Sequence, residues 1–108
     1  MAPEIAAREL KELLDHGAPI QLLDVREPEE LRICALPGAE NVPMLPLFAG
    51  LARPAADPGR PVVVYCHHGI RSADAVTFLR DQGFSDVRSL AGGIDAWAAD
   101  VDPSMTRY

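Results

Sequence analysis

The segment that most constrains this chain is PVVVYCHHGIRS, Pro61 to Ser72. Its β-branched run, Val62 to Val64 followed by Tyr65, has the length and composition of a buried strand. The strand stops at Cys66, a short loop follows, and a helix-like pattern begins at Ser72. Strand, tight loop and helix in this order let successive backbone N–H groups point at one centre, above the positive end of the helix dipole. Because such a cradle stabilises anionic sulfur, Cys66 is the leading candidate for a nucleophile.

Length and charge narrow the classes of function. A chain of 108 residues suits one domain, which we expect to span residues 1–108. The formal net charge of −6 argues against a nucleic-acid partner, because phosphate binding needs a basic stripe. The first residues lack the apolar core of a signal peptide, and no run approaches membrane-spanning length. We therefore expect a cytoplasmic protein with no membrane partner, in which any anion site is local.

The other segments alternate between strand and helix patterns. A helical face carrying Ile5, Leu10, Leu13 and Leu14 ends at Gly17, and residues 20–25 form a buried strand pattern. The sequence then predicts a short helix over 27–33, a brief strand over 39–42, and a proline-rich loop over 43–61 with one short helix near 45–51. An apolar stripe after the cysteine loop ends at Gly83, residues 87–90 form a further strand, and Gly92-Gly93 opens a last helix.

This alternation predicts an α/β fold with a mostly parallel central sheet and helices on both faces. Ligands of such sheets bind beyond the carboxyl ends of the strands, which is where Cys66 falls. Trp97, on the last helix, is most simply a core residue.

Four segments together resemble a known family. LLDVREPEE (22–30), CALPGAENVP (34–43), VVVYCHHGIRS (62–72) and LAGGIDAW (90–97) are similar, in this order, to single-domain rhodaneses. These are sulfurtransferases that carry sulfur as a cysteine persulfide. Many relatives have Gly-His before the Pro-Gly turn where this chain has Cys34-Ala35. The variant with cysteine at this position also resembles the rhodanese modules attached to enzymes that activate sulfur-carrier proteins.

The resemblance implies which residues carry the activity. Cys66 corresponds to the family's catalytic cysteine and Arg71 to its loop arginine. Arg71 suits the sulfonate end of a donor, since a guanidinium fork matches tetrahedral oxyanions, and it can also hold the loop by pairing with an acid. The residues expected to form the active-site loop and bind substrate are His67, His68, Gly69, Ile70, Arg71 and Ser72.

Loop length separates two cysteine chemistries. Cysteine-dependent phosphatases, including relatives that share this fold, have five residues between cysteine and arginine, whereas four lie between Cys66 and Arg71. The shorter ring fits a single sulfur atom and crowds a phosphate. No obvious aspartate general acid follows the loop, since Asp74 belongs to the next helix and is expected to face solvent. Sulfur transfer is therefore favoured over phosphate-ester hydrolysis and over arsenate reduction.

Other polar residues have simpler structural explanations. His67 and His68 are adjacent and match no zinc-ligand spacing, so we expect no metal and no cofactor. Asp24 and Arg26 lie at the same sheet edge as Cys66, and we expect a supporting salt-bridge network there rather than substrate contact. For Cys34, a packed thiol near the Pro-Gly turn is preferred over a resolving cysteine. Gly92-Gly93 lacks a dinucleotide fingerprint and is expected to let the backbone approach the cysteine loop.

The sequence thus predicts a thiosulfate sulfurtransferase of the rhodanese type. Through a Cys66 persulfide it would move sulfane sulfur from thiosulfate or a persulfide to cyanide, a small thiol or a protein thiol. The alternative is a non-enzymatic module that relays sulfur to a partner protein or serves only for docking.

Overall fold

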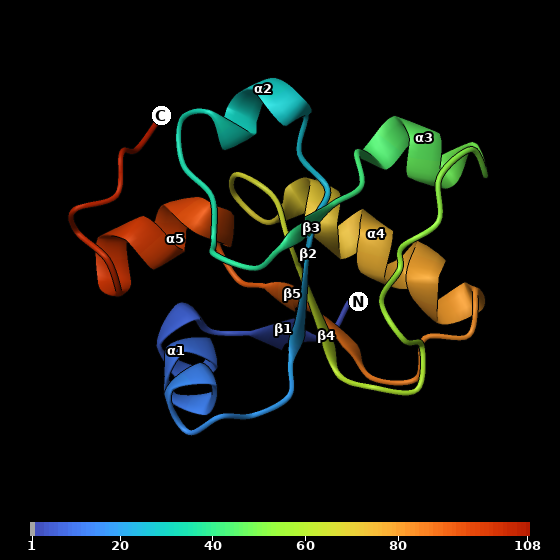
Figure 1. Ribbon diagram of the computed structural model, residues 1–108, viewed down its shortest axis with the longest axis horizontal. Helices are drawn as coiled ribbons and strands as arrows, with labels where there is room; N and C mark the ends of the chain where they lie inside the picture. The colour runs from blue at the N-terminus through green and yellow to red at the C-terminus, as the bar shows by residue number, and fades with distance from the viewer. Residues whose placement is uncertain (1) are drawn as a thin grey trace.

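A parallel five-stranded sheet forms the centre of the molecule (Figure 1). The computed structural model describes residues 2–108. The strands are β1 (Glu4–Ile5), β2 (Gln21–Asp24), β3 (Glu40–Asn41), β4 (Val62–Tyr65) and β5 (Val87–Leu90), in the spatial order β1-β5-β4-β2-β3. Every neighbouring pair is parallel. All four residues of β4 are buried, as expected for a central strand covered on both faces.

Helices cover the two faces of the sheet, as the sequence predicts. The helices are α1 (Ala7–Asp15), α2 (Pro28–Leu31), α3 (Met44–Phe48), α4 (Ile70–Asp81) and α5 (Gly93–Asp100). α1 contacts α5, and α3 contacts α4, so the two pairs form separate layers. The short α2 follows β2 and lies beyond the carboxyl end of that strand (Figure 1).

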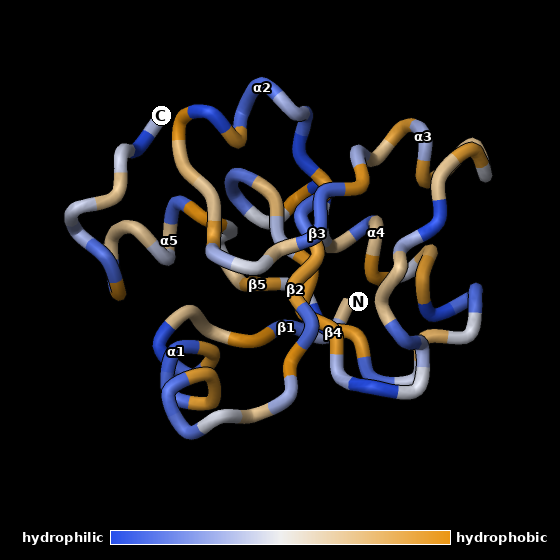
Figure 2. The backbone as a smooth tube through the Cα atoms, viewed as in Figure 1, coloured by the Kyte–Doolittle hydropathy of each residue, from blue (hydrophilic) through white to orange (hydrophobic). Residues whose placement is uncertain are grey.

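Alternate side chains of β4 enter two different hydrophobic clusters. Val62 and Val64 pack with Leu23 and Val76 in one cluster, and Cys66, directly after the strand, belongs to the same cluster. Val63 and Tyr65 pack in the other, which also contains Leu10, Ile94 and Trp97. The apolar colouring in Figure 2 accordingly concentrates along the central strands. Trp97 is a core residue, as predicted.

The structure corrects some predicted element boundaries. Ile5 lies in the edge strand β1, paired with Leu90, and not on the face of the first helix. A strand of two residues is too short to show a period of its own, so its apolar residue merges with the helical pattern that follows. α4 begins at Ile70, two residues before the predicted Ser72, because Gly69 ends the loop in a left-handed conformation with φ 102°.

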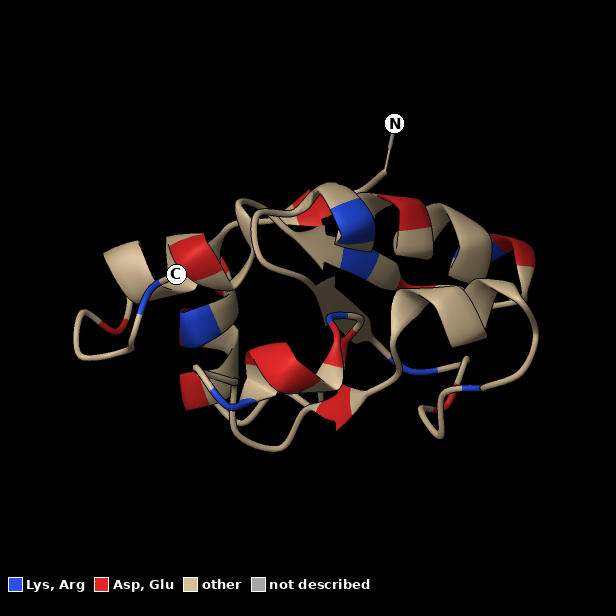
Figure 3. Ribbon diagram, turned by 90° about the horizontal axis from the view of Figure 1, so that it is seen from above, with Lys and Arg blue, Asp and Glu red and all other residues tan. Residues whose placement is uncertain are grey.

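Charge is distributed over several elements. Figure 3 shows basic positions as short separate bands interspersed with acidic ones. Within residues 2–108, no helix combines the length and apolar character needed to cross a membrane. The single domain over 1–108 and the cytoplasmic location stay predictions, and Met1 lies outside the described residues.

Candidate active site

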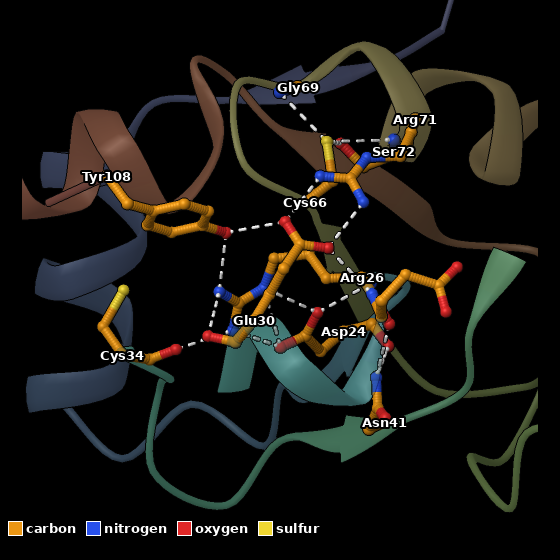
Figure 4. A network of polar contacts seen from close by, with 11 residues as sticks. Asp24, Arg26, Glu30, Cys34, Asn41, Cys66, Gly69, Arg71, Ser72 and Tyr108 are labelled. Carbon is orange, nitrogen blue, oxygen red and sulfur yellow. Dashed lines mark hydrogen bonds and ion pairs between the residues drawn. The ribbon is translucent and has the colours of Figure 1, made fainter. Parts of the chain in front are cut away.

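Backbone amides converge on the sulfur of Cys66. The N–H of Gly69 donates to Sγ at 3.1 Å, and the N–H of Ser72 donates at 3.3 Å (Figure 4). Ser72 lies in the first turn of α4, so the positive end of the helix dipole faces the same atom. Gly69 is required at its position, because a Cβ there would lie 3.2 Å from the backbone nitrogen of Gly92 in addition to the positive φ. This geometry can stabilise an anion on or beside Sγ.

Two buried hydroxyls lie on the other side of the sulfur. The Cys66 thiol donates to Oγ of Ser72 at 3.4 Å, and that oxygen lies 2.7 Å from Oγ of Ser89 on β5. Both serines are fully buried. They provide polar partners for sulfur at the border of an otherwise apolar cluster.

The start of α5 fixes the backbone of the cysteine loop. The N–H of Ile94 donates to the carbonyl oxygen of Cys66 at 2.9 Å, and the N–H of Asp95 donates to that of His67 at 3.1 Å. The approach is so close that a Cβ on Gly93 would lie 2.3 Å from the His67 carbonyl oxygen. The loop carbonyls therefore point at α5, which leaves the amide groups of Gly69 and Ser72 for the sulfur. The predicted close approach of this glycine to the loop is confirmed.

Arg71 is bound to a carboxylate in this structure. Its Nη1 and Nη2 donate to the two carboxylate oxygens of Glu30, on α2, at 2.8 and 2.9 Å. The hydrogen bonds from Arg71 lower the pKa of Glu30 to about 2, against the opposing effect of burial. The same contact raises the pKa of Arg71. Of the two roles predicted for Arg71, the geometry displays the pairing with an acid.

Asp24 and Arg26 form a buried ion pair that ties several segments together. Arg26 donates through Nε and Nη2 to the carboxylate of Asp24, at 2.7 Å for the shortest contact, and both residues are fully buried. Arg26 also donates to the carbonyl oxygens of Glu30 and Cys34 and to the hydroxyl of Tyr108. The pair thus forms the predicted salt-bridge network, and its contacts are with neighbouring loops.

Tyr108 is a site residue that the sequence reasoning missed. Its ring stacks on the ring of His67, with centroids 3.6 Å apart and planes at 4°. Burial raises the pKa of Tyr108 to about 12, so its hydroxyl stays protonated and donates to Glu30 at 2.9 Å. Glu30 and Ser89 were missed too. Ser89 could have been found as a polar residue within the buried strand pattern VRSL. Glu30 could have been found as a carboxylate two residues after Pro28 in the predicted short helix. An isolated aromatic residue such as Tyr108 gave none.

The two loop histidines stack on each other, close to the carboxylate of Asp95. His67, His68 and Asp95 have ligand atoms within 4.8 Å of one another. The centroids of the two rings lie 3.7 Å apart, with the ring planes at 32°. The carboxylate of Asp95 is held by Arg107 at 3.0 and 3.1 Å. This arrangement favours aromatic stacking over chelation.

The remaining predicted residues lie around this centre. Ile70 is 77% exposed at the start of α4, and His68 is exposed as well. Asp74 is exposed on α4, as expected. Cys34 is a half-buried free thiol that packs against the cluster containing Trp97.

These features define a class of protein: α/β domains in which a cysteine loop between a central parallel strand and a helix faces the carboxyl edge of the sheet. The chain belongs to the rhodanese-like family of sulfurtransferases, since the family model described as "Rhodanese-like domain" matches residues 6–100. The resemblance noted in the sequence is thereby confirmed.

Relatives include free-standing proteins and parts of longer ones. The chain is 39% identical to the probable adenylyltransferase/sulfurtransferase MoeZ of Mycobacterium tuberculosis, over 96% of this chain and 26% of MoeZ. It is 36% identical to the thiosulfate sulfurtransferase GlpE of Pseudomonas aeruginosa, over 94% of this chain and 88% of GlpE. The structure of the human single-domain sulfurtransferase TSTD1 superposes with a TM-score of 0.79 and 29% identity, over 93% of this chain and 98% of TSTD1. The chain thus spans about a quarter of the first relative and most of the other two.

Proposed function

We propose that this protein transfers sulfane sulfur through a persulfide on Cys66. The observation that carries the proposal is the pair of amide groups, from Gly69 and Ser72, that donate to Sγ. An amide cradle of this kind stabilises a thiolate before the reaction and a persulfide anion after it. The donor is thiosulfate or a persulfide, and the acceptor is cyanide, a small thiol or a protein thiol.

The reaction consists of two displacements at sulfur. In the first, the Cys66 thiolate attacks the outer sulfur of thiosulfate, a new S–S bond forms, and the old S–S bond breaks with its electron pair leaving on sulfite. In the second, an acceptor thiolate or cyanide attacks the outer sulfur of the persulfide, and the electron pair returns to Sγ. In each displacement the transferred sulfur stays at the sulfane level and the electron pair of the broken S–S bond goes to the leaving group, so neither step needs an external oxidant or reductant.

The loop geometry favours sulfur transfer over phosphate-ester hydrolysis. With four residues between Cys66 and Arg71, the amides of the loop converge on the sulfur atom itself. Asp74, the first acid after the loop, is exposed on α4 and lies outside this set of contacts. We therefore expect negligible hydrolysis of aryl phosphates by the protein, and efficient hydrolysis would contradict the assignment.

Mass spectrometry of the intact protein tests the persulfide directly. Incubation with thiosulfate should add about 32 Da, one sulfur atom, and a thiol or cyanide should remove it. Cys66→Ser should abolish both loading and transfer, because a hydroxyl cannot carry sulfane sulfur. Cys34→Ser is the matched control and should keep most activity. Label mapped to Cys34, or an inactive Cys34→Ser protein, would overturn the single-cysteine scheme.

The alternative function is a relay or docking module for a partner protein. The observation in its favour is that this chain matches about a quarter of MoeZ, a protein named as a probable adenylyltransferase/sulfurtransferase. Steady-state turnover with thiosulfate and a small thiol separates the two. An enzyme gives parallel double-reciprocal lines, whereas a pure relay loads once and does not turn over.

A further inference from the structure

The arginines around the cysteine loop are each bound to a carboxylate. Arg71 is paired with Glu30, Arg26 with Asp24, and Arg107 with Asp95, whose own N–H donates to the His67 carbonyl. In each pair the guanidinium makes at least two contacts with its carboxylate. Thiosulfate is a dianion, and its sulfonate end is best bound by an available cation. These three ion pairs offer it none without first opening.

Glu30 is held in place from several directions. Besides the two bonds from Arg71, its carboxylate accepts the hydroxyl of Tyr108 at 2.9 Å and the N–H of Glu27 at 2.8 Å. Its side chain is 18% exposed. With a pKa of about 2 it is ionised at neutral pH. A sulfonate that displaced it from Arg71 would therefore face an anchored negative charge at close range.

The sulfur end of a donor does not need Arg71, so the negative charge of Glu30 does not oppose it. The N–H groups of Gly69 and Ser72 and the Ser72 hydroxyl meet Sγ without help from Arg71. These contacts hold the attacking sulfur, and they are the same whatever group carries the terminal sulfur of the donor. A donor whose sulfur is attached to a thiol, with no sulfonate, can therefore use the cradle while the pair between Arg71 and Glu30 stays closed.

We propose that Glu30 is a specificity-determining residue that selects persulfide donors over thiosulfate by keeping Arg71 occupied. This inference rests on the proposed sulfur transfer and names its donor class. The Cys66 thiolate attacks the terminal sulfur of R–S–SH, a new S–S bond forms, and the old one breaks. Its electron pair leaves on the thiolate RS⁻, so the loaded cysteine is Cys66–S–SH and no net oxidation occurs.

The test compares Glu30→Gln with the control Glu29→Gln, which removes the same charge from an exposed position on α2. Glu27 and Tyr108 donate to different carboxylate oxygens of Glu30, so the single amide oxygen of Gln can accept from one of them. The amide cannot hold a guanidinium as a charged fork. For Glu30→Gln we expect the KM for thiosulfate to fall roughly tenfold, the ratio that about 1.4 kcal/mol produces. The KM for the persulfide of 2-mercaptoethanol should stay within about twofold. Glu29→Gln should leave both KM values close to wild type.

Methanesulfonate, which has a sulfonate but no transferable sulfur, gives a readout separate from turnover. It should inhibit Glu30→Gln with persulfide as donor, and inhibit the wild type and Glu29→Gln much less. An unchanged thiosulfate KM in Glu30→Gln, or an equal fall for both donors, would reject the role of Glu30 while leaving sulfur transfer intact. If neither donor loads Cys66 in the wild type, the proposed function itself is rejected.

Discussion

Replacement of Gly93 by alanine should displace the cysteine loop. Gly93 has a left-handed φ of 64°, and a Cβ there would lie 2.3 Å from the carbonyl oxygen of His67 and 2.6 Å from that of Cys66. Both neighbours are backbone atoms of the loop, so no flexible side chain can yield. The carbonyl has to retreat by roughly 0.7 Å before the contact reaches even a tight 3.0 Å.

Two costs follow from this geometry. The left-handed conformation alone costs an alanine about 1–2 kcal/mol of folding stability. The displacement also moves the amides that meet Sγ, and a misplacement near 1 Å can cost about 10²-fold in rate. We therefore expect Gly93→Ala to lose stability and to load sulfur about a hundredfold more slowly.

Gly83→Ala separates the two costs. Gly83 also has a positive φ, 99°, but a Cβ there would meet nothing within 4 Å. The control should lose a similar 1–2 kcal/mol, roughly, and keep its loading rate. Urea denaturation measures the free energy of unfolding of each variant. Mass spectrometry of samples quenched at successive times, without urea, measures the rate at which Cys66 gains sulfur. Equal loading rates in the two variants would refute the idea that contact at Gly93 positions the loop.

Two further predictions concern the ion pairs. Asp24→Asn leaves the fully buried Arg26 without its counter-charge, and should lower the free energy of unfolding by about 3–5 kcal/mol in urea titrations; a loss below about 1 kcal/mol would contradict a structural role for the pair. The second follows from the pKa of Glu30, which is lowered from 4.5 to about 2 in the folded protein. The stabilisation from its pairing with Arg71 is then fully present above pH 4.5 and is lost as the pH falls toward 2. The difference in unfolding free energy between wild type and Glu30→Gln should shrink over that range, and a difference that stays constant down to pH 2 would contradict the pairing.

Local sequence patterns predicted most of the fold. The β-branched run of β4 is buried on both faces, so all its residues are apolar. Such a continuous apolar run predicts a strand without knowledge of the neighbouring strands. Cys66 and Gly69 belong to one short loop, so their geometry is set by neighbours in the chain. The edge strand β1 was not predicted, because its two residues acquire their conformation only by pairing with β5.

The partners of the site residues were harder to predict. Pairing with an acid was one of the two roles predicted for Arg71, but its partner Glu30 is 41 positions away, and Tyr108 reaches Glu30 across 78 positions. Such contacts depend on how α2 and the last residues lie on the sheet, and each exposed acid was an equal candidate. The buried pair of Asp24 and Arg26 was predictable because its members are two residues apart at a strand end.

The burial of Cys66 has a consequence for how fast sulfur could be exchanged. Cys66 is 1% exposed and belongs to an apolar cluster with Leu23 and Val76. Dissolved oxidants and stray thiols therefore reach its sulfur atom only when the surrounding segments move aside. In the proposed reaction, loading and delivery would each need such a transient opening. The frequency of opening would then limit both steps, and a recipient that promotes the opening would be served ahead of one that waits for it.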